Sequence, residues 1–434
     1  MSEIFEIAYA AATNRLCLFT GTGFSKAVTE NNVPSWQGLL EKLCDLLPDS
    51  VELKKSLFPD DKPSPLTLEE IAQVISIKLS SKGKNIHEET AKLFENIELC
   101  GNNGGISKFF SERKFRVVTT NYDKLAENLT GESECQSLAP GLPIPRASAN
   151  VKVYHVHGSI DSPDNMVLTS EDYFKFINGD SYFSRKLSTV LHENTVVILG
   201  YSLGDTNLKA IISDYKGFSK AHVIGSNIFL VSRSAVEQHV KDYYSHCYGI
   251  RVLDSMDTHE FFESLNEKTP KVESIAQRSI DSIRNVVYKN YHFKEAFIKL
   301  EDSFYRIISA LSAEGLSLAD KRVVSVIGDV IDAKRELTTE NNAWEQYEHL
   351  ARWLIYLGTI FEIKGTTIED LYLKAVLRSM NTMSNRLIIG YSWHAYNAWK
   401  NRWSSIISSN RALIKKYIEE KSSEGDALSV INAA

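Results

Sequence analysis

Four polar clusters in the sequence each follow an apolar run of strand length, and their residue types could do chemistry. They lie at residues 21–25 (Gly-Thr-Gly-Phe-Ser), 121–123 (Asn-Tyr-Asp), 157–158 (His-Gly) and 200–205 (Gly-Tyr-Ser-Leu-Gly-Asp). A glycine turn after a buried strand lets backbone N–H groups approach phosphate oxygens, because no side chain intervenes. A histidine suits general-base catalysis, since its unperturbed pKa lies near neutral pH. The clusters indicate a site for a phosphate or dinucleotide ligand.

Several of these residues also allow a purely structural interpretation. Lys26 replaces the third glycine of the dinucleotide fingerprint G-x-G-x-x-G, so Gly21 and Gly23 could form an ordinary tight turn. Asn121 could cap a turn or a helix, and Asp205 has the position of a helix N-cap. Each cluster by itself leaves both interpretations open.

Two histidines compete for the functional role in the third cluster. His157 could act as a base, or it could be a hydrogen-bonded histidine of the core or of a turn. His155 lies two residues earlier in an alternating run, which places both side chains on the same side of the predicted strand. His155 is therefore an alternative candidate.

The elements that would position these clusters predict an α/β fold. Apolar runs predict strands at residues 16–20, 115–120, 151–156, 195–199, 227–231 and 250–253. Helical patterns lie at residues 3–13, 36–47, 67–80, 87–99 and 234–245. Short apolar strands that alternate with helices predict a Rossmann-like parallel sheet with helices on both faces. Because ligands bind beyond the carboxyl ends of such strands, the four clusters are expected to form one site.

The pattern changes at about residue 270, where strand patterns stop and long helical patterns begin. One apolar stripe at helical spacing consists of Phe293, Phe297, Leu300, Phe304, Ile307, Ile308 and Leu311. We expect a catalytic domain at residues 1–268 and an all-α domain at 269–434, which would serve oligomerisation, partner binding or regulation. The tail after Ser422 is expected to be frayed.

The composition is that of an ordinary soluble globular protein, and it argues against several classes of function. The net charge of −6 and the lack of a long basic run do not indicate nucleic-acid binding. The five cysteines form no C-x-x-C pair, so no metal site is expected. Because no membrane-spanning stretch and no signal-peptide pattern occur, the chain is expected to be cytoplasmic.

The four clusters resemble sirtuin motifs in order and rough spacing. Residues 21–25 are similar to the sirtuin G-A-G-x-S loop, 119–123 to T-Q-N-x-D, 157–158 to the catalytic H-G pair and 200–203 to G-T-S-L. This resemblance covers residues 1 to about 268. Together with residues 33–36 (Val-Pro-Ser-Trp) and 168–173 (Leu-Thr-Ser-Glu-Asp-Tyr), it looks closest to the sirtuin-like NADase branch of bacterial anti-phage defence proteins.

The resemblance implies NAD as the substrate and suggests a role for each matched residue. His157 would be the base, and Asn121 would orient the nicotinamide or the attacking water. Asp123 would hold the Asn121 loop or bind the nicotinamide amide. The other expected NAD-binding residues are Gly21, Thr22, Gly23, Phe24, Ser25, Gly200, Ser202 and Asp205.

One departure from the sirtuin pattern bears on the reaction. Sirtuin deacylases carry a four-cysteine zinc module between the H-G pair and the later strands, whereas this sequence has no cysteine between residues 136 and 246. The missing module removes most of the support for an acyl-lysine peptide groove. Water is then the expected acceptor, and the predicted reaction is hydrolysis of NAD⁺ to nicotinamide and ADP-ribose without a metal.

The resemblance also implies a biological role. Uncontrolled NAD hydrolysis would kill the cell, so we expect an NAD-depleting effector of abortive infection that stays inactive until it is triggered. Expected partners are further copies of the chain, a HerA-type ATPase or a nucleotide-processing protein; neither a membrane nor a nucleic acid is expected. The alternatives are a non-catalytic module that senses NAD or ADP-ribose, and a zinc-less deacylase or ADP-ribosyltransferase.

Overall fold

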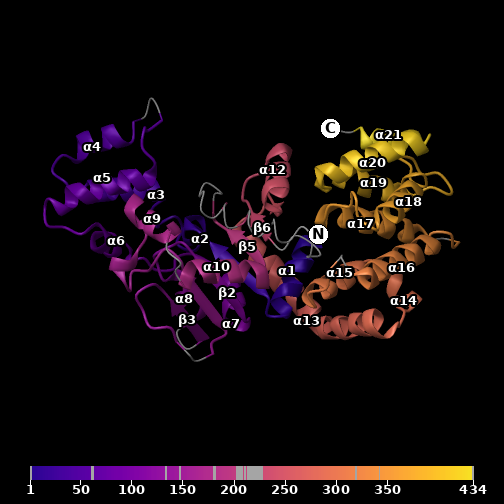
Figure 1. The fold of residues 1–434 in the computed structure, drawn as a ribbon, viewed down its shortest axis with the longest axis horizontal. Coiled ribbons are helices and arrows are strands. Elements are labelled where there is room, and N and C mark those ends of the chain that lie inside the picture. The colour runs from indigo at the N-terminus through magenta and orange to yellow at the C-terminus, as the bar shows by residue number, and fades with distance from the viewer. Residues whose placement is uncertain are drawn as a thin grey trace.

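The computed structural model contains one parallel sheet in its N-terminal part and helices alone in its C-terminal part (Figure 1). It describes residues 2–59, 63–131, 134–145, 148–178, 182–201, 209, 212, 228–317, 320–341 and 343–432. The seven strands are ordered β3-β4-β2-β1-β5-β6-β7, and every neighbouring pair is parallel. They are β1 (Leu16–Thr20), β2 (Phe115–Thr119), β3 (Cys135–Leu138), β4 (Val151–His155), β5 (Thr195–Leu199), β6 (Ile228–Val231) and β7 (Ile250–Leu253).

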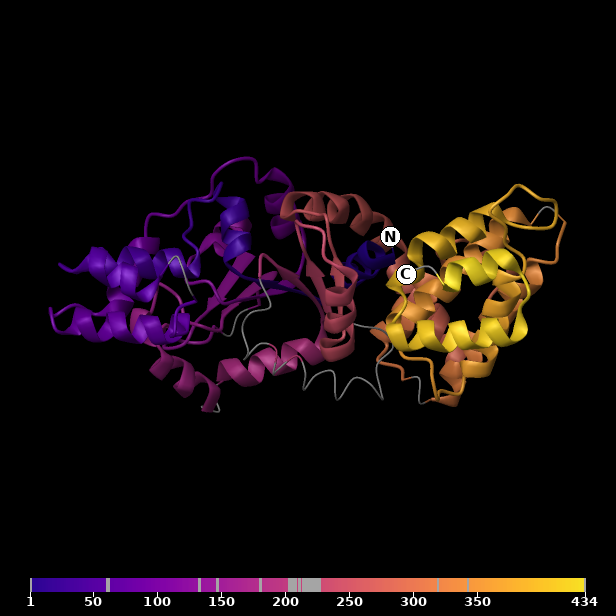
Figure 2. The same cartoon turned by 90° about the horizontal axis from the view of Figure 1, so that it is seen from above.

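Alternate residues of the central strand face two separate cores, which explains its continuous apolar sequence. Leu16 and Leu18 of β1 belong to a core shared with α1, α7 and α13, whereas Cys17 and Phe19 belong to a smaller core shared with α10. A parallel sheet that is covered on both faces needs apolar residues at every position of its inner strands. In Figure 2, α10 and α13 lie on opposite sides of the sheet. The predicted Rossmann-like fold is confirmed.

Strand β1 is the point at which the chain changes direction across the sheet. The chain adds β2, β3 and β4 on one side of β1 and then returns to place β5 on its other side. At such a switch point the connections leave β1 and its neighbours toward opposite faces, which opens a crevice at the carboxyl ends of the strands. The loop after β1 is therefore the natural place for a ligand.

The helices of the N-terminal part surround the sheet and extend beyond its carboxyl edge. They are α1 (Ser2–Ala12), α2 (Thr22–Val28), α3 (Trp36–Cys44), α4 (Ser50–Leu57), α5 (Leu68–Ser80), α6 (Ile86–Phe94), α7 (Gly104–Glu112), α8 (Leu125–Thr130), α9 (Ser170–Asn178), α10 (Tyr182–Glu193) and α12 (Gln238–Tyr248). Ser35 caps α3 by accepting from the Gly38 N–H at 3.1 Å, as its position in the sequence predicts. Helices α3 to α6 form one end of the molecule (Figure 1).

A long helix, α13 (Thr258–Lys289), leads from the sheet into the helical part. It begins at a capping box between Asp257 and Glu260, and its first turns pack against α1 and α7. The predicted division at residues 268/269 falls inside this continuous helix, and the division remains a prediction. The following helices are α14 (Glu295–Ile298), α15 (Ser303–Ala313), α16 (Lys321–Leu337), α17 (Trp344–Ile360), α18 (Glu369–Met380), α19 (Trp393–Arg402), α20 (Ser408–Lys421) and α21 (Gly425–Ile431).

One local expectation from the sequence was wrong, and one strand was not predicted. The segment after Ser422 is not frayed, because α21 buries Ala427, Val430 and Ile431 against the helical core. The sheet also has an edge strand, β3, that the apolar runs do not predict. Its sequence Cys-Gln-Ser-Leu lacks an apolar run, but pairing with β4 satisfies the backbone groups on the side that faces β4. In the part of the chain that the structure describes, no helix has the length and apolarity that crossing a membrane requires.

Candidate functional site

A cavity of about 840 Å³ lies at the carboxyl edge of the sheet, beneath α3, α5 and α9. Its volume is within the range of about 300–1,000 Å³ that is usual for small-molecule sites. The loops after β1, β2, β4 and β5 form its floor. They bring together the predicted site residues Thr22, Asn121, Asp123, His157 and Gly200. Residues from all four sequence clusters thus meet at one cavity.

The glycines of the first cluster allow the loops after β1 and β5 to touch. Gly21 donates its N–H to the Leu199 carbonyl at 3.1 Å, and Gly23 donates to the Gly200 carbonyl at 2.7 Å. A Cβ atom on Gly200, which has a φ of +62°, would lie 1.9 Å from the Phe24 nitrogen. In this arrangement the Gly21 and Gly23 amides bind the neighbouring loop, so their predicted role in holding phosphates remains untested.

Phe24 and Ser25, two further predicted NAD-binding residues, are not among the residues that line the cavity. The Phe24 ring is buried and stacks on Phe110 with ring centres 6.2 Å apart, which makes it part of the core. Ser25 is equally buried, but its hydroxyl links two residues that do line the cavity. Thr22 lines the cavity directly.

A chain of side-chain hydrogen bonds fixes the orientation of Asn121. The Asn121 Nδ2 atom donates to Ser25 Oγ at 2.7 Å, and Ser25 Oγ donates to Asp123 Oδ2 at 2.7 Å. An ionised carboxylate only accepts and a serine hydroxyl has one proton, so the direction of both bonds follows when Asp123 is charged. The amide group of Asn121 therefore turns its nitrogen toward Ser25, which leaves Oδ1 as the acceptor that it can offer elsewhere.

Asp123 is a buried carboxyl group whose protonation state controls this chain. Burial raises the pKa of Asp123 above its usual range, and the hydrogen bonds from Ser25 and from the Leu125 N–H partly oppose this rise. Protonation of Asp123 would make it the donor to Ser25. The serine would then donate to Asn121, whose side-chain amide would have to turn its oxygen toward Ser25.

The two histidines of the third cluster have different environments. The ring of His157 lines the cavity and has the edges of Tyr173 and Phe176 against it, with ring centres 5.4 Å and 5.3 Å away. Strand β4 ends at His155, so the alternation expected from the sequence does not continue to His157. His155 is fully buried below the cavity and contacts the Asn121 carbonyl and Glu127. His157 is thus the histidine that a ligand in the cavity would meet.

The helical roof of the cavity supplies residues that the sequence did not mark as site residues. Trp36 lies at the start of α3, Glu69 and Glu70 lie in the first turn of α5, and Phe174 lies on α9. An amphipathic pattern shows which helix face is apolar, but it does not show which surface that face meets. In the sequence, the motif at residues 33–36, which contains Ser35 and Trp36, was the signal that could have identified part of the roof.

Asp172 holds the α9 end of the roof in place. Its Oδ2 atom accepts from the Thr169 N–H at 2.9 Å and lies 2.9 Å from His87 Nε2 on α6. Partial burial would raise the pKa of Asp172, but the His87 and Thr169 hydrogen bonds outweigh this effect and lower the pKa to about 2. Asp172 thereby fixes Tyr173, whose ring packs against His157. The motif at residues 168–173 therefore serves to position a wall of the cavity.

Two predicted site residues, Ser202 and Asp205, lie outside the described residues. Their expected contacts with ribose or adenine stay predictions. Among the residues that are described, no three His, Cys, Asp or Glu side chains are grouped as a metal ion would require. The five cysteines carry free thiols.

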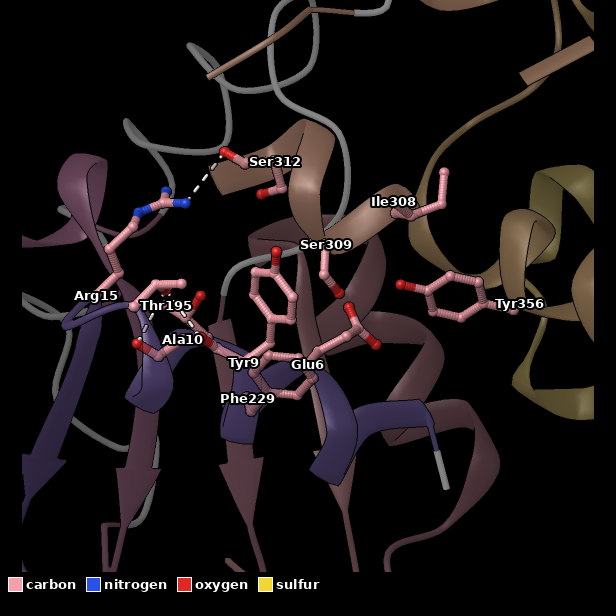
Figure 3. A pocket seen from close by; sticks show the side chains of 11 residues that line it. Glu6, Tyr9, Ala10, Arg15, Thr195, Phe229, Ile308, Ser309, Ser312 and Tyr356 are labelled. Carbon is pink, nitrogen blue, oxygen red and sulfur yellow. Dashed lines mark hydrogen bonds between the residues drawn. The ribbon is translucent and has the colours of Figure 1, made fainter. Parts of the chain in front are cut away.

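A second cavity, at the junction of the sheet and the helical part, is too small for a nucleotide. Its volume is about 30 Å³, which is enough for one water molecule. Figure 3 shows Glu6 of α1 and Tyr356 of α17 pointing toward one another across it. Nearby, Arg15 donates to the Ser312 carbonyl at 3.1 Å. This junction joins α1 to the helical part.

Comparison with known proteins identifies the class of the N-terminal part. Residues 116–253 match the family model of the SIR2-like domain. The chain is 22% identical over 266 residues to Defense-associated sirtuin 2 of Bacillus subtilis, an alignment that covers 59% of this chain and 25% of that protein.

Two further relatives are named as NAD(+) hydrolase ThsA. The protein of Enterococcus faecium is 35% identical over 104 residues, which are 23% of this chain and 22% of the relative. The protein of Cytobacillus dafuensis is 21% identical over 365 residues, which are 82% of this chain and 63% of the relative. The chain spans less than two thirds of the length of each of these proteins. Its parallel sheet, its strand-end cavity and these matches show that the protein contains a sirtuin-like domain similar to that of a defence-associated sirtuin.

Proposed function

We propose that this protein hydrolyses NAD⁺ to nicotinamide and ADP-ribose. The observation that carries the proposal is the convergence of Asn121, Asp123 and His157 on one cavity, with Asn121 oriented through Ser25. The names of two relatives, both NAD(+) hydrolases, support the same chemistry.

The reaction needs groups of the kind that the cavity offers. Cleavage breaks the bond between the ribose carbon and the nicotinamide nitrogen, and the electron pair leaves with nicotinamide. The ribose passes through an oxocarbenium-like transition state, to which water adds with release of a proton. His157 would accept a proton from water or from a ribose hydroxyl. Asn121 Oδ1 would accept a hydrogen bond from the same water or ribose, and Asp123 would hold Asn121 in place.

Water is a better candidate acceptor than an acyl-lysine peptide. The chain has no cysteine between residues 136 and 246, so a four-cysteine zinc module of the sirtuin deacylase kind has no ligands there. The described roof of the cavity consists of helices α3, α5 and α9, which cover the floor where His157 lies. Exclusion of a protein substrate would leave water to capture the ribose carbon.

The biological role that we propose is defence by depletion of NAD in the infected cell. The similarity to a defence-associated sirtuin supports this role. Such an enzyme has to be inactive until a trigger arrives, and the helical part would provide that control by self-association or by binding a partner. Junctions such as the one around Glu6 and Tyr356 would transmit the signal.

The proposal is tested by incubating the purified protein with NAD⁺, alone and together with candidate partner proteins, and measuring nicotinamide release by chromatography. Wild type is compared with His157→Ala and Asn121→Ala, and with His394→Ala as a control at an exposed histidine of the helical part. In at least one of these conditions we expect release by wild type and the control, and almost none by the two site variants. Full release by either site variant would contradict the proposal. Tight NAD⁺ binding without product under any condition would favour a sensor.

A further inference from the structure

Below the cavity floor, His155 lies between two hydrogen-bond acceptors. Its Nδ1 atom is 3.1 Å from the main-chain carbonyl oxygen of Asn121, and its Nε2 atom is 2.8 Å from Glu127 Oε1. A carbonyl and a carboxylate only accept hydrogen bonds, so both ring nitrogens have to carry a proton. With Glu127 ionised, this geometry places a proton on both ring nitrogens, which makes His155 a positively charged imidazolium.

The surroundings of His155 stabilise this charge. Burial disfavours the imidazolium, but the charge and the hydrogen bond of Glu127 outweigh burial, so that the pKa of His155 is raised above its ordinary value. Burial likewise opposes the ionised form of Glu127, yet the facing His155 lowers the pKa of Glu127 to about 2. Lys124 and Asp123 are the other charged groups that act on His155.

Glu127 is in turn held on the side away from the cavity. Its Oε1 atom accepts from Ser137 of β3 at 2.6 Å and lies 3.1 Å from Lys124 Nζ. Its Oε2 atom is buried and has no hydrogen-bond partner among the described residues. All contacts of the carboxylate thus converge on the oxygen that meets His155, which fixes the imidazole ring.

The contact with Asn121 connects this ion pair to the site. Three groups then hold Asn121: its N–H donates to Thr119 Oγ1 at 3.1 Å, its side chain donates to Ser25, and its carbonyl accepts from His155. We propose that His155, held as an imidazolium by Glu127, is a positioning residue that fixes Asn121 for cleavage of NAD⁺. This inference rests on the proposed function. His155 does not line the cavity and does not touch the substrate.

Two substitutions at the same position separate the two hydrogen bonds of His155. In His155→Asn, the side-chain nitrogen can take the place of Nδ1 and donate to the Asn121 carbonyl. In His155→Gln, the nitrogen can reach the place of Nε2 and donate to Glu127, which leaves the Asn121 carbonyl without this donor. Both variants remove the same ring and the same charge, so each is a control for the stability of the other.

We expect kcat to fall about 100-fold in His155→Gln, because small misplacements of a reacting group have effects of this size. In His155→Asn we expect kcat within about tenfold of wild type. The KM for NAD⁺ should change by less than about threefold in both, since His155 does not contact the ligand. Asp161→Asn, which removes another partner of Lys124, should leave kcat unchanged. Equal kcat in the Gln and Asn variants, at equal melting temperature, would overturn the inference.

A second measurement tests the inference without turnover. In ¹⁵N NMR spectra of the full chain at pH 7.5, the His155 ring should show protons on both nitrogens, and the Asn121 side-chain amide signal should move in His155→Gln but not in His155→Asn. A neutral His155 ring, or an Asn121 signal that stays in place in His155→Gln, would overturn the positioning role. Absence of nicotinamide release by wild type, both alone and with candidate partner proteins, would instead contradict the proposed function, and the NMR result would still decide the role of His155.

Discussion

The sheet part and the helical part both bury polar side chains, but these side chains have different partners. At the carboxyl edge of the sheet, Asn121, Ser25 and Asp123 bond to one another. In the helical part, Asn410 donates to the carbonyls of Gly358 and Phe361, each at 2.8 Å, and accepts from the Ile363 N–H at 2.9 Å.

Lys334 of the helical part likewise bonds to a main-chain carbonyl, and it bonds to one side chain as well. It is fully buried, donates to the Ile298 carbonyl at 2.8 Å and to Gln346 Oε1 at 2.7 Å, and lies over the Trp353 ring. Ile298 is the last residue of α14, so Lys334 satisfies a carbonyl that the helix itself leaves without a partner. Buried polar groups of this kind are explained by the fold.

The difference separates groups that stabilise the fold from groups that prepare a reaction. A buried side chain that satisfies the main chain is needed wherever helix ends are covered. Side chains that satisfy one another at strand ends are not required by the sheet, and they leave an acceptor such as Asn121 Oδ1 available. Four predictions test this distinction.

The largest effect is expected for Asn121→Ala and His157→Ala. Nicotinamide release should fall by about 10²- to 10⁴-fold, the usual size for removal of an acid–base or orienting group. The melting temperature should change little, because neither side chain satisfies a helix end. Activity is measured by chromatography and stability by calorimetry. A variant that keeps its activity but melts early would place its residue among the structural groups.

The opposite outcome is expected for Asn410→Ala. Loss of three buried hydrogen bonds should reduce the free energy of unfolding by about 2–4 kcal/mol, because the Phe361 carbonyl and the Ile363 N–H lose Asn410 as a partner. The Gly358 carbonyl keeps the Ile407 N–H as a donor. Activity per folded molecule should remain unchanged. Denaturant unfolding measures the loss, and Lys416→Ala, at an exposed position of the same helix, is the control. A free energy of unfolding equal to that of wild type would show that the hydrogen bonds of Asn410 to the main chain do not stabilise the fold.

The buried Lys334 predicts a dependence of stability on pH. Burial lowers the pKa of Lys334 to about 7, whereas it is about 10.4 in the unfolded chain. Between these values the unfolded chain binds more protons, so this lysine makes the fold less stable toward low pH and more stable as the pH rises. The stability of Lys334→Met relative to wild type should therefore decrease by roughly 2 kcal/mol from pH 7 to pH 9.

The measurement for Lys334 is urea unfolding of both proteins across this pH range. Lys374→Met, which changes an exposed lysine of α18, should give a difference from wild type that is nearly independent of pH. A pH-independent difference for Lys334→Met would mean that Lys334 stays charged in the folded protein.

The smallest expected effect is the change in the free energy of unfolding in Asp123→Asn. Its sign distinguishes a group that prepares the reaction from a group that stabilises the fold. Burial raises the pKa of Asp123, so its charged form at pH 7 costs stability, and this cost disappears as the pH falls below the folded-state pKa. Asparagine should therefore raise the free energy of unfolding at pH 7, by less than the changes expected for Asn410→Ala and Lys334→Met. Nicotinamide release should fall nevertheless, because the direction of the Ser25 hydrogen bond changes. A destabilised variant would assign Asp123 to the structural groups.

Most of the fold could be predicted from the sequence, because its signals are local. The continuous apolar run of β1, which ends in Gly-Thr-Gly, predicts a central parallel strand. The strand β3 was missed because it is stabilised by pairing with β4, and not by apolar residues of its own. The helix α21 was missed because its few apolar residues become significant only against the helical core.

The candidate site could be predicted in part. The clusters that contain Asn121, Asp123 and His157 could be found because polar residues follow strands, and parallel strands bring their carboxyl ends together. The roof with Trp36 and Phe174 could not, since no local pattern tells which surfaces of distant helices meet. The prediction for Phe24 as an NAD-binding residue stays untested, although its ring lies in the core.

The sequence by itself thus determined six of the seven strands, their parallel arrangement and the meeting of the polar clusters at the carboxyl edge, because apolar runs and turn residues act over a few positions. Only the tertiary structure decided that His157 faces the cavity while His155 supports Asn121 from below. It also decided that Ser25 joins Asp123 across 98 residues of sequence. Such hydrogen bonds depend on how separate elements pack, and a pattern within one segment does not contain that information.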